Sequence, residues 1–124
     1  MIWAVAFGGA AGSVLRYLVS LWMKSVKVDF PIATLLVNVT GCLLIGLFVR
    51  LFSTAGSSPV MRAALTIGFC GGFTTFSTFS AEFVTLVQEG REMRAVLYVV
   101  LSVTIGILAT LVGMTLGNRI IAAR

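Results

Sequence analysis

The chain has 124 residues, of which 59% are hydrophobic and 10% are charged, and its formal net charge is +5. A soluble domain carries about 25% charged residues, so charge this sparse cannot cover a water-facing surface. The absence of histidine from the sequence excludes histidine-based acid–base catalysis and the commonest metal ligand. The basic residues occur singly, which argues against a nucleic-acid-binding face, and the mean hydropathy of +1.09 indicates a membrane protein.

Four apolar stretches follow one another along the chain, at residues 2–23, 31–49, 63–87 and 95–118. A helix needs about 20 apolar residues to cross the hydrocarbon core of a bilayer, and each stretch meets that length. The only charges inside the stretches are Arg16 in the first and Glu82 in the third. We therefore predict an all-α membrane protein: one domain over residues 1–124 with four transmembrane helices.

The basic residues outside these stretches are evenly divided between the two sides of the predicted domain. One side carries Lys24, Lys27, Arg91 and Arg94, and the other carries Arg50, Arg62, Arg119 and Arg124. The excess of cytoplasmic positive charge that normally sets orientation is almost absent. Either the weak bias still gives one orientation, or the chain inserts both ways and pairs as an antiparallel homodimer. We favour the second, because four helices alone enclose little space for a pathway.

The third stretch has an unusual composition, with two glycines at 71–72 followed by five Ser or Thr residues among phenylalanines up to Ser80. Glycine exposes backbone, and non-helical backbone survives in a membrane only where protein or a wet cavity surrounds it. We predict a discontinuous helix with its break near residues 71–75, where freed carbonyls could hold a cation and freed N–H groups could meet an anion. Close helix packing is the alternative for Gly68 and Gly72, but it does not explain the hydroxyls.

Polar and aromatic residues on the other helices can join this segment. Phe76 and Phe79 fall on one helical face beside Thr78 and Ser80, so their positive ring edges could flank a small anion. Core packing is the ordinary alternative for such a stripe. The further candidates are Asn38 as an amide donor, Glu82 near a membrane end, Tyr98 with Ser102 on one face, and Arg16 as a pairing or snorkelling charge. Cys42 and Cys70 are predicted to be small buried side chains.

The sequence resembles the Fluc (CrcB) family of fluoride ion channels over nearly its full length. The match rests on Gly71-Gly72-Phe73-Thr74-Thr75-Phe76-Ser77-Thr78-Phe79-Ser80, supported by Val37-Asn38 with Gly41 and by Gly8-Gly9, Gly12 and Arg16-Tyr17. The resemblance implies a dual-topology antiparallel homodimer in the bacterial inner membrane, with two antiparallel pores that export fluoride passively.

The resemblance also implies roles for individual residues. Phe76 and Phe79 resemble the aromatics that line the pores, one from each subunit in a given pore. Asn38, Thr78 and Ser80 are expected as donors beside them, Glu82 near a pore entrance, Tyr98 with Ser102 as a polar path, and Arg16 near the vestibule. The backbone carbonyls of Gly71 and Thr74 are expected to bind a structural sodium ion (Na+) on the dimer axis.

A small four-helix, dual-topology multidrug or guanidinium exporter is the main alternative function. Proton-coupled export of a cation needs a membrane-embedded carboxylate, best placed in the first helix, and residues 2–23 contain only Arg16. A scaffold subunit would explain the glycines but not the hydroxyls. The sequence shows no catalytic constellation, so we predict a protein that is not an enzyme.

Overall fold

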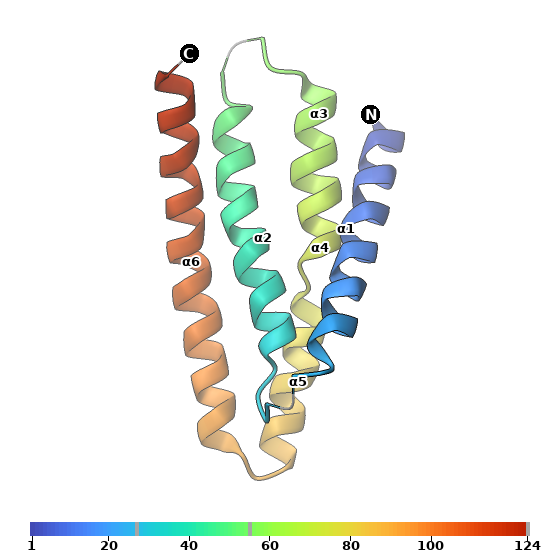
Figure 1. Ribbon diagram of the computed structural model, residues 1–124, viewed down its shortest axis with the longest axis vertical. Helices are drawn as coiled ribbons and strands as arrows, with labels where there is room; N and C mark the ends of the chain where they lie inside the picture. Colours follow the sequence, from blue (N-terminus) through green and yellow to red (C-terminus); the bar gives the residue numbers. More distant parts are fainter. Residues whose placement is uncertain (27, 55, 124) are drawn as a thin grey trace.

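The computed structural model describes residues 1–26, 28–54 and 56–123, and every element in this described part is helical (Figure 1). The elements in chain order are α1 (Ile2–Met23), α2 (Ile32–Leu51), α3 (Pro59–Ala63), the π-helix η1 (Ala64–Cys70), α4 (Gly71–Phe73), α5 (Phe76–Gln88) and α6 (Glu92–Ala122). The three long helices α1, α2 and α6 are long and apolar enough to cross a membrane. The prediction of an all-helical chain is confirmed for the described residues, and three of the four predicted spans are single long apolar helices.

The third predicted span differs from one long helix. Helices α3, η1 and α4 run on without interruption to Phe73, and α5 begins at Phe76 after two extended residues. The chain therefore covers this span with two shorter helical pieces. The break between them is visible as a thin connection between α4 and α5 (Figure 1). The predicted discontinuity is present, but Gly71 and Gly72 are helical and the break lies after them.

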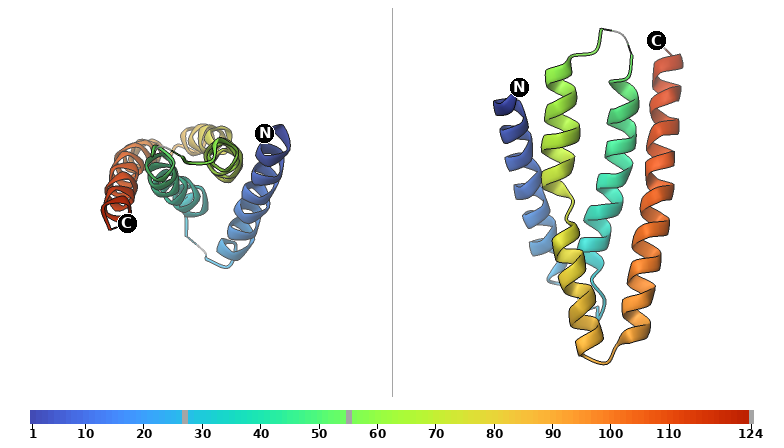
Figure 2. Two further views of the ribbon diagram at one scale, coloured as in Figure 1. Left: turned by 90° about the horizontal axis from the view of Figure 1, so that it is seen from above. Right: turned by 180° about the vertical axis from the view of Figure 1, so that it is seen from behind.

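The helices pack in two groups through glycines. Helix α6 lies along α2, and α1 lies along η1 and α4 (Figure 2). A Cβ at Gly113 would collide with the backbone carbonyl of Leu43, and a Cβ at Gly72 would collide with that of Gly9. These glycines let two backbones approach closely, so the packing interpretation of Gly72 is confirmed and the break does not depend on its conformational freedom.

The two ends of the molecule separate the loops as the topology predicts. The α1–α2 connection and the α5–α6 turn lie at one end, while both termini and the α2–α3 connection lie at the other (Figure 1). Among the described basic residues, Lys24, Arg91 and Arg94 belong to the first end, and Arg50, Arg62 and Arg119 belong to the second. Lys27 and Arg124 of the predicted balance lie outside the described residues.

A small core lies near the end that carries the α5–α6 turn. Leu86, Ala95 and Tyr98 are buried there, with Phe30 and Phe79 packed against them. Most other large apolar side chains are exposed on the single chain, as a lipid-facing surface requires. Phe76, the first residue of α5, is 79% exposed on the single chain.

Candidate functional site

Thr74 and Thr75 form the break between α4 and α5. Both residues are extended, with φ −79° and ψ 159° at Thr74 and φ −150° and ψ 115° at Thr75. Thr75 is the N-cap of α5, and its hydroxyl accepts a hydrogen bond from the Thr78 amide at 3.2 Å. Threonine suits this position because its side-chain oxygen satisfies an amide that has no partner inside the helix. The local sequence thus starts α5 at Phe76.

The side chain of Asn38 on α2 forms two hydrogen bonds with the backbone at the break. Its side-chain oxygen accepts from the Thr75 N–H at 2.8 Å, and its side-chain nitrogen donates to the Thr75 carbonyl at 3.1 Å. The amide therefore replaces both backbone partners that Thr75 would have in a continuous helix. One of its two N–H groups is used in this way, so Asn38 has one donor left, where the sequence suggested two.

The break releases two backbone carbonyls. In a continuous helix the Gly71 carbonyl would accept from Thr75 N–H and the Thr74 carbonyl from Thr78 N–H. The Thr75 amide instead donates to Asn38, and the Thr78 amide donates to the Thr75 hydroxyl. Gly71 and Thr74 line the same cavity of about 310 Å³ beside Asn38. The two carbonyls predicted as sodium ligands are thus free of their helical donors, and oxygen ligands suit a hard cation.

Arg16 reaches the same region from α1. Its Nε donates to the Gly72 carbonyl at 3.1 Å, and the Ser13 hydroxyl donates to that carbonyl at 3.4 Å. Arg16 also lines a small cavity of about 40 Å³ with Thr75 and Thr78. The sequence left open whether Arg16 pairs or snorkels. In the structure it is paired, and its partner is a backbone carbonyl oxygen. A buried carbonyl just before the break has no helical donor, which is why a guanidinium is useful there.

Glu82 is held by two hydroxyls from other helices. Thr34 on α2 donates to Oε1 at 2.9 Å, and Tyr98 on α6 donates to Oε2 at 2.7 Å. Thr34 is 7% exposed and Tyr98 is fully buried. The sequence analysis missed Thr34. Its spacing four residues before Asn38 places both polar side chains on one face of α2, and that spacing could have revealed it.

The aromatic side chains form a short series beside this carboxylate. The ring centroids of Phe76 and Phe79 lie 5.7 Å apart, and those of Phe79 and Tyr98 lie 4.9 Å apart. Phe30 meets Tyr98 edge to face with centroids 5.5 Å apart. Phe79 is thus packed against the core, whereas Phe76 is exposed on the single chain. The structure brings both rings together on one side of α5.

The predicted hydroxyl donors differ in whether their protons are already used in hydrogen bonds. Thr78 accepts from the Thr75 hydroxyl at 3.0 Å, so its own O–H is available. Ser80 donates to the Phe76 carbonyl at 2.9 Å, which uses its proton within α5. The Ser102 hydroxyl is buried, and among the residues that the structure describes none lies within hydrogen-bonding distance of it. A buried polar group without a partner marks a place where a ligand could supply one.

A groove runs along one face of α5 and links Thr78 to the end of the molecule. Its volume is about 350 Å³, and it is lined by Val28, Asp29, Phe30, Pro31, Thr78, Ala81, Glu82, Thr85, Leu86, Glu89 and Arg91. The α5 residues in this set recur every three or four positions, so they form one face. The groove therefore extends from the surface at Glu89 and Arg91 to Thr78 near the break.

The two cysteines lie in the cavity at the break rather than in the groove. Cys70 is 2% exposed and Cys42 is half-buried, and both line the cavity that contains Gly71. The prediction of a small buried side chain is confirmed for Cys70. Cys42 contacts the position where a Cβ on Gly106 would lie, at 3.4 Å from its sulfur, so it packs between α2 and α6.

Together these features define a small helical membrane protein with a broken helix, a polar groove and carbonyls released at mid-span. The family described as CrcB-like protein, Camphor Resistance (CrcB), matches residues 3–114. The chain is 44% identical over 96% of its length to a Flavobacterium psychrophilum protein named fluoride-specific ion channel FluC, covering 98% of that protein. It is 45% identical over 95% of its length to an Acidobacterium capsulatum protein of the same name, covering 96% of it.

A third relative, from Bacillus subtilis, is named fluoride-specific ion channel FluC 2 and is 46% identical over 94% of this chain and 87% of its own length. The chain belongs to the CrcB family, and the predicted resemblance is confirmed. The names of these relatives also confirm the prediction that the protein is not an enzyme.

Proposed function

We propose that this protein is a fluoride channel that lets the ion leave the cell passively through the bacterial inner membrane. The observation that carries the proposal is the identity of 44–46% over nearly the whole chain to proteins named as fluoride-specific ion channels. The geometry is compatible with that function, because the groove along α5 leads from one surface to the Thr78 hydroxyl near the break.

The proposed path uses several weak donors in place of water. Fluoride is small and strongly hydrated, so a pore has to offer hydrogen-bond donors at each step and still release the ion. Thr78 has a free O–H, Asn38 has one unused N–H, and the buried Ser102 hydroxyl has no partner among the described residues. The positive edges of Phe76 and Phe79 supply weak contacts between them. Ser80 offers no donor to an anion in this arrangement, since its proton is used in the bond to the Phe76 carbonyl.

A second copy of the chain completes the proposed pore. Phe76 is 79% exposed and also lines the cavity at the break, a position that suits contact with a partner better than contact with lipid alone. The even division of basic residues supports an antiparallel homodimer with two pores, since neither orientation is favoured. In that dimer each pore would receive aromatic rings from both subunits.

The structural sodium ion is part of the same proposal. Each chain offers the carbonyls of Gly71 and Thr74, and two chains related by a two-fold axis would double that number. A sodium ion bound there would balance the partial negative charge of the carbonyls that the break releases. Thr74→Ser keeps both the carbonyl and the hydroxyl, so it is expected to preserve the dimer.

The direct test is anion efflux from liposomes that hold the purified protein. Fluoride efflux is expected to be fast, with chloride efflux and guanidinium uptake near the level of empty liposomes. Fast guanidinium transport coupled to a proton gradient would support the exporter alternative and refute the channel. Equal fluoride and chloride rates would refute fluoride selectivity.

The topology is tested separately with C-terminal tags at native expression. A dual-topology dimer places tags on both sides of the membrane. Three lysines added after Arg124 should bias the orientation and reduce activity, and a partner biased the other way should restore it. Tags confined to one side would refute the antiparallel arrangement.

A further inference from the structure

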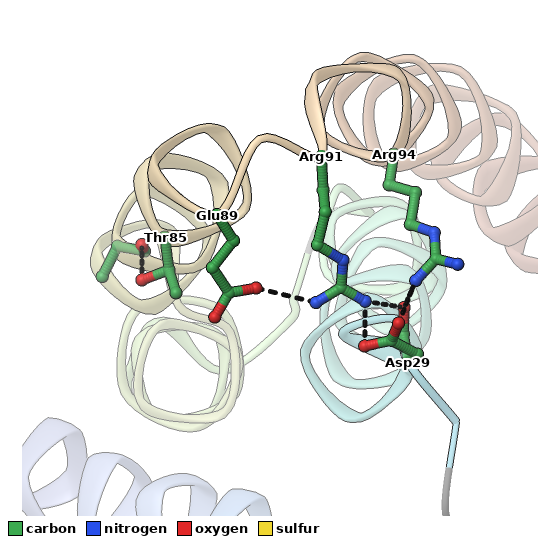
Figure 3. A network of polar contacts seen from close by, with 6 residues as sticks. Asp29, Thr85, Glu89, Arg91 and Arg94 are labelled. Carbon is green, nitrogen blue, oxygen red and sulfur yellow. Dashed lines mark hydrogen bonds and ion pairs between the residues drawn. The ribbon is translucent and has the colours of Figure 1, made fainter.

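Asp29 ties two arginines together at the surface end of the groove (Figure 3). Arg91 and Arg94 each form an ion pair with its carboxylate, and each also donates to its backbone carbonyl at 3.0 Å. Arg91 makes a further ion pair at 2.7 Å with Glu89, the C-cap residue that follows α5. Asp29 belongs to the α1–α2 connection and Arg91 to the α5–α6 turn, so these contacts bring two loops together.

The cluster lies where the groove opens to water. The lining residues of α5 and its C-cap run from Thr78 to Glu89, which corresponds to about 16 Å along the helix axis. The charged groups that line it are Asp29, Glu82, Glu89 and Arg91, three carboxylates against one guanidinium. An anion that enters here meets unfavourable charge unless the arginines offset it. Arg94 adds a second guanidinium through its pair with Asp29.

We propose that Arg91 and Arg94 draw the permeating anion to the mouth of the groove, and that Asp29 both positions them there and limits their attraction for the anion. The proposal rests on the proposed channel function and deepens it. Exposed ion pairs contribute little to stability, and the Asp29 side chain is 68% exposed, so folding alone gives weak reason for two arginines on one carboxylate. The carboxylates of Asp29 and Glu89 instead balance the charges of Arg91 and Arg94, so removal of any single charge changes the attraction of the cluster for an anion.

Asp29→Asn separates charge from geometry. The backbone carbonyl of residue 29 still accepts from both arginines, so they stay at the mouth while one negative charge is removed. A unit charge about 10 Å away in water changes the local concentration of a monovalent anion by about twofold at low ionic strength. Fluoride efflux from liposomes at low salt and low fluoride is therefore expected to rise about twofold.

The dependence of the efflux rate on salt concentration distinguishes an electrostatic role from a structural one. A purely structural role would change the efflux rate equally at low and high salt. Potassium gluconate at high concentration screens exposed charges, so the Asp29→Asn variant is expected to match wild type there. Arg91→Gln should change low-salt efflux in the opposite direction, with about half the wild-type rate, and this difference should also vanish in high salt. Arg94→Gln should do the same without disturbing the contact to Glu89. Asp29→Glu restores the charge and should return the low-salt rate toward that of wild type.

Three results would overturn the proposal. Equal low-salt rates for Asp29→Asn and wild type would show that the cluster's charge does not act on the ion. Reduced rates for both Asp29→Asn and Asp29→Glu at every salt concentration would show that the cluster only holds the two loops together. Wild-type rates in Arg91→Gln and Arg94→Gln would remove the recruiting role. If wild type itself moves no fluoride, the channel function fails first, and that control distinguishes the two failures.

Discussion

Replacing Asn38 by leucine tests whether this side chain holds the helix break open. Leucine has the same branched side-chain shape and no hydrogen-bonding group, so it removes both bonds to Thr75 at a modest increase in volume. The Thr75 N–H and carbonyl then lose their partners at membrane depth. Interhelical hydrogen bonds in membranes are worth about 0.6–2 kcal/mol each, so the loss is about 1–4 kcal/mol for the two.

The consequence reaches the proposed ion path because Thr75 is also the N-cap of α5. Without Asn38 the Thr75 amide can return to the Gly71 carbonyl, which would close the break into continuous helix and withdraw one proposed sodium ligand. We expect the variant to be less stable by about 1–4 kcal/mol in detergent unfolding and to lose fluoride efflux. Hydrogen exchange at the Thr75 amide reports the local change directly.

Asn38→Asp and Val39→Leu provide the controls. Aspartate keeps the acceptor for the Thr75 N–H at 2.8 Å but removes the donor to its carbonyl, so it separates the two bonds. Val39→Leu changes volume at the neighbouring position without touching the break. Unchanged stability and unchanged exchange at Thr75 in the leucine variant would refute the reasoning, since the break would then be set by α5 alone.

Three further predictions follow from the packing and contacts around the break. Phe76→Ile and Phe79→Ile should each reduce fluoride efflux about fivefold in protein that still elutes as a dimer, because a ring edge worth about 1 kcal/mol is lost. The control Phe69→Ile should conduct normally. Normal efflux in both Phe76→Ile and Phe79→Ile would show that these rings serve only for packing. Tyr98→Phe removes the 2.7 Å bond to Glu82 and should cost about 1.5–3 kcal/mol in unfolding free energy, a cost that should nearly vanish in a Glu82→Gln background if the charged bond is responsible. Gly72→Ala should destabilise the fold by about 1–3 kcal/mol, because its Cβ meets the Gly9 backbone. Gly71→Ala has open space around its Cβ in the single chain, so it should fold normally and weaken only the dimer. Equal thermal stability of the two variants would contradict this packing.

Composition and hydropathy were sufficient for the membrane class and for the three long helices, because a bilayer selects apolar length almost independently of tertiary contacts. The predicted first helix at residues 2–23 coincides with α1. The discontinuity in the third stretch also followed from composition, since glycine and hydroxyl residues are poor material for a lipid-exposed helix. Its location did not, because the glycines are helical and the break begins at Thr74.

Only the tertiary structure decided which groups meet. Asn38 and Thr75 are 37 residues apart, and Thr34 and Glu82 are 48 apart, so no local pattern could pair them. The break lies after Phe73 because Asn38 on another helix satisfies the Thr75 backbone, an interaction that local propensity cannot encode. Likewise, the sequence left Arg16 either to pair or to snorkel, and in the fold it donates to the Gly72 carbonyl, which the break has released. The sequence determines a membrane protein with a weak third helix, and the packing of α1 and α2 against that helix decides where it opens.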